Sequence, residues 1–207
     1  MSTSQITLHG MSLSGHVHRV RLLLEMLELP YRHIETTAQS RAAPGFRGIS
    51  PLGQVPVIED GELALADSNA IMTYLVKRYA PDSRWLPAAP ATAAQVQRWL
   101  SVAAGELRFG PARARGIWLF GRHDDPAPAQ AIAAQLLAVM DAHLEERAFL
   151  AAEHPTIADL ACYAYTARAP EGGVALEPYG AVRAWLARVE ALPRFVPMPA
   201  STEPVSL

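Results

Sequence analysis

Lysine, cysteine and aromatic residues are scarce in this chain of 207 residues. Lysine occurs once, at Lys77, among 18 basic residues, and the formal net charge is −2. No run of basic residues is present, which argues against a nucleic-acid surface. No segment reaches the roughly 20 consecutive apolar residues that a membrane-spanning helix needs, so we expect no membrane association. The first residues lack the basic-then-apolar pattern of a secretory signal, so we expect a cytoplasmic protein.

The single cysteine, Cys162, excludes an internal disulfide and is typical of a reducing compartment. Its apolar surroundings in the sequence favour a packing role. Arginine supplies all basic residues but Lys77, and alanine and proline are abundant. These residues have GC-rich codons, so we expect a bacterial source.

Apolar sequence is plentiful, at 50% of the chain, which is enough for a sizeable core. Residues 1–80 alternate between strand and helix patterns, and a strand–helix–strand unit followed by a hairpin predicts a mixed four-stranded sheet. Residues 81–90 are rich in proline and predict a linker. Residues 91–196 carry helical periodicity throughout, which predicts an all-α domain. Residues 197–207 contain three prolines and few apolar residues, so we expect a poorly ordered tail.

The most informative stretch spans residues 50–71. Asp60-Gly61 lies between two short apolar runs, which is the sequence signal for a two-residue type I′ hairpin turn. Asp67 and Ser68 follow, at the position of a helix N-cap. A helix that begins there presents unpaired N–H groups, which favour an anionic, peptide-like ligand.

Gln54-Val55-Pro56, followed by Asp67-Ser68 and an apolar helix, resembles the glutathione-binding half of the cytosolic glutathione transferases. The resemblance implies an α/β N-terminal domain of thioredoxin-like fold, with a cis peptide bond before Pro56, and an all-helical C-terminal domain. It further implies glutathione as co-substrate, no metal and a homodimer.

The turn that begins at Met11 carries the chemistry that the resemblance implies. A free thiol has a pKa near 8.5, and lowering it by two units takes about 2.7 kcal/mol of preferential thiolate stabilisation. A hydroxyl donor at a helix N-terminus supplies energy of that order. In serine-type members the functional serine stands six residues before a valine of the first helix, and Ser14 stands six before Val20. Ser12 remains the competing donor, and a simple N-cap role stays open for both serines.

The remaining glutathione contacts are those that the resemblance implies. The main chain of Val55 would pair with the cysteinyl unit, and Ser68 would take the γ-glutamyl carboxylate. Asp67 would face the ammonium group, and Gln54 and Arg41 would hold the glycyl carboxylate.

Two histidines of the first helix, His16 and His18, invite a metal hypothesis. They lie two residues apart, on different sides of a helix, and no acidic or cysteine residue clusters with them, so we expect no metal site. His16 could assist thiolate formation, bind the glycyl carboxylate or simply occupy the helix start, and the sequence leaves these open.

Thr156 and Asp159 form a variant of the capping box ahead of an apolar helix. The alternative makes Asp159 a general base. The alanine-rich helix that follows suits close packing better than chemistry, so we favour the structural interpretation.

The second substrate is expected to contact Met11, Leu13, Phe109 and Arg113, with Leu107 and Trp118 nearby. These residues are large and mostly apolar, which favours an apolar or aromatic electrophile of unspecified identity. The hypothesis is therefore a detoxifying glutathione transferase. The alternatives are a non-catalytic binding protein of this fold, and glutathione-dependent peroxidase or thiol–disulfide exchange, the last of which normally needs a cysteine in the turn.

Two helices carry apolar residues on more than one face, namely those around Met72 and Trp99. A helix that is apolar all round is buried, so we expect these helices to pack against a second copy of the chain. Packing within one chain is the alternative.

Overall fold

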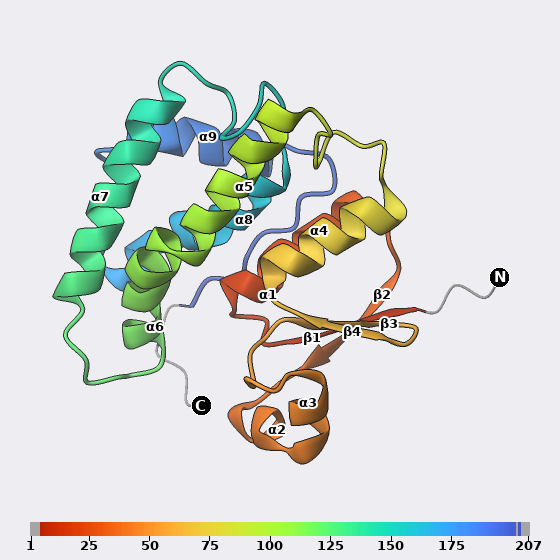
Figure 1. Ribbon diagram of the computed structural model, residues 1–207. Coiled ribbons are helices and arrows are strands. Elements are labelled where there is room, and N and C mark those ends of the chain that lie inside the picture. Colours follow the sequence, from red (N-terminus) through yellow and green to blue (C-terminus); the bar gives the residue numbers. More distant parts are fainter. Residues whose placement is uncertain (1–4, 202, 204–207) are drawn as a thin grey trace. The chain divides into compact units, whose positions relative to one another are not determined.

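The computed structural model describes residues 5–201 and 203, and the chain divides into two compact units (Figure 1). Unit 1 comprises the residues up to Asp82 together with Pro193–Pro199. Unit 2 comprises Ser83–Leu192 and, of the last residues described, Ala200, Ser201 and Glu203. Among the residues described, no helix is both long enough and apolar enough to cross a membrane.

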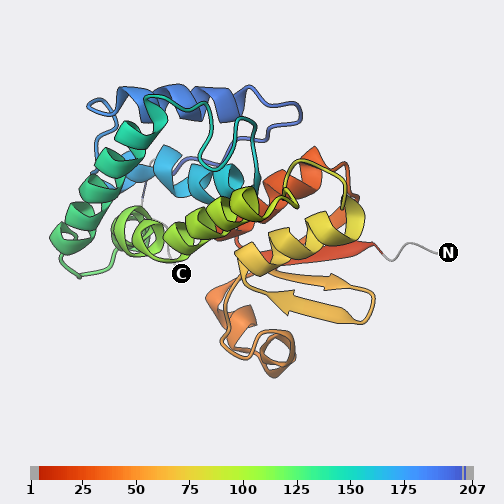
Figure 2. The same ribbon diagram turned by 45° about the horizontal axis from the view of Figure 1, so that its top comes forward.

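Unit 1 is built on a mixed four-stranded sheet in the order β2-β1-β3-β4 (Figures 1 and 2). The strands are β1 Ile6–Gly10, β2 Tyr31–Glu35, β3 Val57–Asp60 and β4 Leu63–Ala66. Strands β1 and β2 are parallel, whereas β1 with β3 and β3 with β4 are antiparallel. The predicted thioredoxin-like arrangement is confirmed, because a crossover helix makes the first pair parallel and a hairpin makes the last pair antiparallel.

Two helices, α1 Gly15–Met26 and α4 Ser68–Tyr79, cover one face of the sheet, and two short helices lie on the other (Figure 1). The core beneath α1 and α4 consists of fully buried aliphatic side chains, among them Leu8, Val20, Ile58, Ile71 and Leu75. Burial of each such side chain contributes about 1.5–3 kcal/mol, so this layer holds both helix N-termini at the sheet edge.

The segment between β2 and β3 forms two short helices, α2 Ala38–Ala42 and α3 Pro44–Ile49. Ala43 separates them, with φ −65° and ψ 144°. The residue before a proline is pushed out of the α region, and Pro44 suits the first position of a new helix because it lacks an N–H.

The hairpin turn differs from the prediction by one residue. Asp60 pairs with Leu63, so the central residues are Gly61 and Glu62. Only Gly61 has a positive φ, of 62°, whereas a type I′ turn needs two. The type I′ prediction is therefore wrong, since glutamate is disfavoured at positive φ. Asp60 instead accepts hydrogen bonds from the hydroxyls of Tyr74 and Tyr79 on α4.

Unit 2 is entirely helical, as predicted. Its helices are α5 Pro90–Ala104, the π-helical segment η1 Arg108–Ala112, α6 Arg113–Leu119, α7 Ala127–Leu144, α8 Ile157–Ala167, the 3-10 segment η2 Ala169–Gly172 and α9 Gly180–Glu190. Helix α8 forms its core, because every residue from 157 to 166 is buried.

The capping box at the start of α8 is present and fully buried. Asp159 accepts from the backbone N–H of Thr156 at 2.8 Å and of Leu150 at 2.9 Å, and from Trp185 Nε1 at 3.0 Å. Burial raises the pKa of the Asp159 carboxyl, and these hydrogen bonds oppose the rise. The carboxylate is thus engaged by α9 and by the loop before α8, which supports its structural role.

After α9 the chain returns to unit 1. Val196 O accepts from His18 Nε2 at 2.8 Å, Arg194 pairs with Glu28 at 2.5 Å, and Met198 is 1% exposed. The sequence pattern assigns residues 193–196 to the helical domain, whereas they pack on unit 1. Residues 202 and 204–207 of the expected tail lie outside the described residues.

Candidate active site

The turn after β1 places Ser14 at the N-terminus of α1. Ser14 has extended backbone angles, φ −84° and ψ 121°, and its Oγ accepts from the backbone N–H of Val17 at 3.4 Å. Its own N–H donates to Met11 O at 2.9 Å, which closes the turn. A serine hydroxyl has one donor and two acceptor positions, so N-capping leaves its proton available for an anion. A thiolate beside this hydroxyl would also meet the positive end of the helix dipole.

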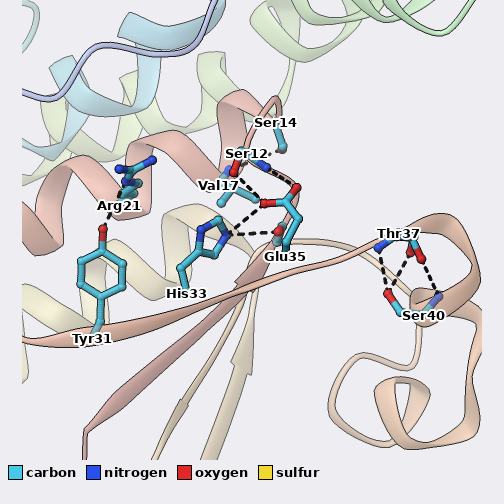
Figure 3. A network of polar contacts seen from close by, with 10 residues as sticks. Ser12, Ser14, Val17, Arg21, Tyr31, His33, Glu35, Thr37 and Ser40 are labelled. Atoms are coloured by element: carbon cyan, nitrogen blue, oxygen red, sulfur yellow. Dashed lines mark hydrogen bonds and ion pairs between the residues drawn. The ribbon is translucent and has the colours of Figure 1, made fainter. Parts of the chain in front are cut away.

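Ser12, the competing donor, is engaged elsewhere. Its Oγ donates to Glu35 Oε2 at 2.6 Å, and its backbone N–H donates to Glu35 Oε1 at 2.8 Å (Figure 3). Donation to a thiolate would require Ser12 to give up a charge-assisted hydrogen bond, which is about twice as strong as a neutral one. The geometry therefore favours Ser14.

The N-terminus of α4 is the second half of the site. Asp67 caps it, because its Oδ1 accepts from the N–H groups of Asn69 and Ala70, both at 2.9 Å. Its backbone has a φ of 74° and a ψ of 119°, a sparsely populated conformation for a non-glycine residue. Such strain costs about 1–3 kcal/mol and concentrates at ligand sites. Ser68, which is 4% exposed, follows directly, so its hydroxyl stands at the first turn of the helix.

Arg19 is a residue of the site that the sequence analysis missed. It is 1% exposed, and its Nη1 donates to Asn69 Oδ1 at 3.1 Å and lies 3.4 Å from Ser68 Oγ. A buried guanidinium thus links α1 to the first turn of α4, and its charge favours an anion there. The available signal was indirect: Arg19 lies directly before Val20 and three and four residues before Leu22 and Leu23, all of which are buried.

His16 also approaches Ser68, with its Nδ1 3.5 Å from Ser68 Oγ. This contact places the ring at the α4 N-terminus rather than in a metal cluster. In the described part of the chain, no three or more His, Cys, Asp or Glu side chains are grouped to hold a metal ion.

The loop before β3 presents Val55, and the peptide bond between Val55 and Pro56 is cis. Ser50, which is 1% exposed, holds this loop, because its Oγ accepts from Gln54 N and donates to Gln54 O, both at 3.0 Å. The side chain of Gln54 is exposed. Arg41 lies in the last turn of α2, and its part in glycyl carboxylate binding stays a prediction.

The residues predicted to contact the second substrate come from both units. Met11 and Leu13 are half-buried residues of unit 1. In unit 2, Phe109 is 56% exposed, and Arg113 pairs with Asp124 at 3.1 Å. Leu107 is fully buried, so it belongs to the core and is removed from the predicted pocket wall.

Both units match known protein families. Residues 8–83 match the family model described as glutathione S-transferase, N-terminal domain, and residues 69–193 match glutathione S-transferase, C-terminal domain. The chain is 32% identical over 206 residues to glutathione S-transferase 3 of Zea mays. The aligned region covers 92% of this chain and 91% of that relative.

Solved structures agree with this assignment. The glutathione S-transferase from Pseudomonas fluorescens matches with a TM-score of 0.88 at 32% identity, covering 94% of this chain and 99% of that one. A glutathione transferase homolog from Drosophila mojavensis, solved with bound glutathione, matches with a TM-score of 0.81 at 26% identity, covering 91% and 89%. The chain therefore belongs to the glutathione S-transferase family.

Proposed function

We propose that this protein conjugates the thiolate of glutathione to small apolar or aromatic electrophiles, with Ser14 as the hydroxyl that stabilises the thiolate. Family membership and fold support glutathione transferase activity in general. The observation that carries the finer proposal is the position of Ser14 at the N-terminus of α1, with its hydroxyl proton not used by the N-cap bond. Ser12, by contrast, donates to Glu35.

Thiolate formation needs no general base in this mechanism. One hydrogen bond to a charged group contributes about 1.5–3 kcal/mol, and a helix N-terminus adds about 0.3–1 kcal/mol. Together they reach the roughly 2.7 kcal/mol that lowers a thiol pKa by two units. The bound thiol would then be mostly ionised near neutral pH, ready to attack an electrophile.

The N-terminus of α4 would hold the γ-glutamyl end of glutathione. Ser68 and the nearby guanidinium of Arg19 offer positive potential and a donor for the carboxylate, while the second carboxylate oxygen of Asp67 would receive the ammonium group. Val55 would pair its main chain with the cysteinyl unit, and Gln54 and Arg41 would take the glycyl carboxylate.

We also propose a cytoplasmic homodimer that acts in detoxification, from a bacterial source. Met11, Leu13, Phe109 and Arg113 would contact the electrophile. The alternative is a non-catalytic binding protein of the same fold, which would bind apolar ligands or partners.

Two successive measurements, of glutathione binding and then of conjugation, separate these functions. The protein should be retained on immobilised glutathione and eluted by free glutathione. It should then conjugate glutathione to a generic aromatic halide above the uncatalysed rate. Retention without turnover on a broad panel of electrophiles would favour the non-catalytic protein. Failure to bind glutathione at all would overturn the proposed transferase.

A further inference from the structure

The turn that carries Ser14 is held by a carboxylate from the neighbouring strand. Strands β1 and β2 are parallel, and Gly10 at the end of β1 pairs with Glu35 at the end of β2. Because parallel strands end at the same edge of a sheet, Glu35 lies beside the turn that starts at Met11. Its two oxygens accept from the two donors of Ser12, the backbone N–H and the hydroxyl, at 2.8 and 2.6 Å (Figure 3).

A second contact from β2 fixes the start of the same turn. His33 Nε2 lies 3.1 Å from Gly10 O, so it donates to that carbonyl, and it lies 3.9 Å from Glu35 Oε2. At the other end, Ser14 N–H donates to Met11 O. The turn is thus tied to β2 at its first residues and closed at Ser14.

We propose that Glu35 is a positioning residue for the thiolate-stabilising hydroxyl, which rests on the function proposed for Ser14. By holding Ser12 through both oxygens, Glu35 fixes the path of the turn and hence the position of Ser14 Oγ. Hydrogen bonds weaken steeply with poor distance and angle, and functional groups must be held within about 0.5 Å of their working position.

Positioning and simple charge predict opposite effects of removing Glu35. A negative charge near the sulfur disfavours the thiolate, so charge alone would make the pKa of the bound thiol fall in Glu35→Ala. Loss of positioning weakens the hydrogen bond from Ser14, so the pKa of the bound thiol would rise. The direction in which the thiol pKa shifts therefore identifies the role of Glu35. Replacing a purely structural residue would leave the thiol pKa unchanged.

The test is the thiolate absorbance of bound glutathione as a function of pH. Glu35→Ala should raise the pKa of the bound thiol by about 0.5 units, with the glutathione affinity changed less than about twofold. Ser12→Ala removes one of the two donors and should cause a smaller rise in the same direction. Glu59→Ala is the matched control, because Glu59 is also a half-exposed carboxylate on the same sheet, paired with a histidine at 2.5 Å. It should leave the titration unchanged.

The double variant Ser14→Ala/Glu35→Ala separates the two proposals. If Glu35 acts through Ser14, adding Glu35→Ala to Ser14→Ala should raise the pKa of the bound thiol no further, since coupled residues are not additive. An unchanged or lowered pKa in Glu35→Ala, beside a raised pKa in Ser14→Ala, would overturn the role of Glu35 and leave that of Ser14 standing. An unchanged titration in Ser14→Ala itself would overturn the proposed function of Ser14.

Discussion

Replacing Ser14 by alanine removes one hydroxyl that has two separate tasks. As an N-cap, its Oγ accepts from Val17 N–H over a long 3.4 Å. As a donor, the same oxygen would give its proton to the sulfur of glutathione. The two tasks have different energies and different assays, so a single variant measures both.

The thiol effect should be the larger. A hydrogen bond to a charged group contributes about 1.5–3 kcal/mol, and one pKa unit corresponds to about 1.4 kcal/mol. Ser14→Ala should therefore raise the pKa of bound glutathione by about one to two units, as measured by thiolate absorbance against pH. Turnover at pH 7 should fall about 3- to 25-fold, because a rise from a thiol pKa of about 6.5 lowers the ionised fraction by that factor. The affinity for glutathione should change little, because in the proposed mechanism the hydroxyl would contact only the sulfur of glutathione.

The stability effect should be small. Loss of an N-cap costs about 0.5–2 kcal/mol, and the length of this bond puts Ser14→Ala at the low end of that range. Thr37→Ala is the matched control, because Thr37 is also an N-cap in unit 1 and accepts from Ser40 N at 3.1 Å. It should lower the denaturation midpoint at least as much, with no change in thiol titration. A thiol pKa in Ser14→Ala equal to that of the unaltered protein would refute the mechanism.

Ser68→Ala and Asp67→Ala should weaken glutathione binding about 5- to 30-fold, measured by isothermal titration calorimetry. Turnover at saturation should change less, because the proposed contacts hold the γ-glutamyl end of glutathione and not its sulfur. Unaltered affinity with a large loss of turnover would contradict the assignment. Asp159→Ala should lower the free energy of unfolding by about 3 kcal/mol in chemical denaturation, because it leaves the buried donors of Leu150, Thr156 and Trp185 unpaired. An effect below about 0.5 kcal/mol would argue against the capping role. Light scattering at micromolar concentration should give twice the 22.4 kDa of one chain, and a mass near one chain would exclude the homodimer.

Much of the site was predictable because its parts are local in sequence. The caps at Ser14, Asp67 and Thr156 each depend on a short side chain and on N–H groups two or three residues further along. Such contacts form wherever a helix begins, so residue type and spacing are sufficient to locate them. The same holds for the order of strands and helices, which follows from apolar periodicity. The local signal failed at the hairpin turn, where of the two central residues only Gly61 has a positive φ.

Tertiary structure decided the contacts between distant residues. Glu35 meets Ser12 only because β1 and β2 pair in parallel with Gly10 opposite Glu35, a register that neither segment specifies by itself. Arg19 is buried against Asn69 because α1 and α4 pack on one face of the sheet. The periodicity of α1 identifies its apolar stripe. It does not show which helix will cover the buried guanidinium of Arg19. Polar contacts between distant residues depend on packing geometry, which the sequence pattern does not contain. The contact with Glu35 occupies the hydroxyl of Ser12, and this favours Ser14 as the donor.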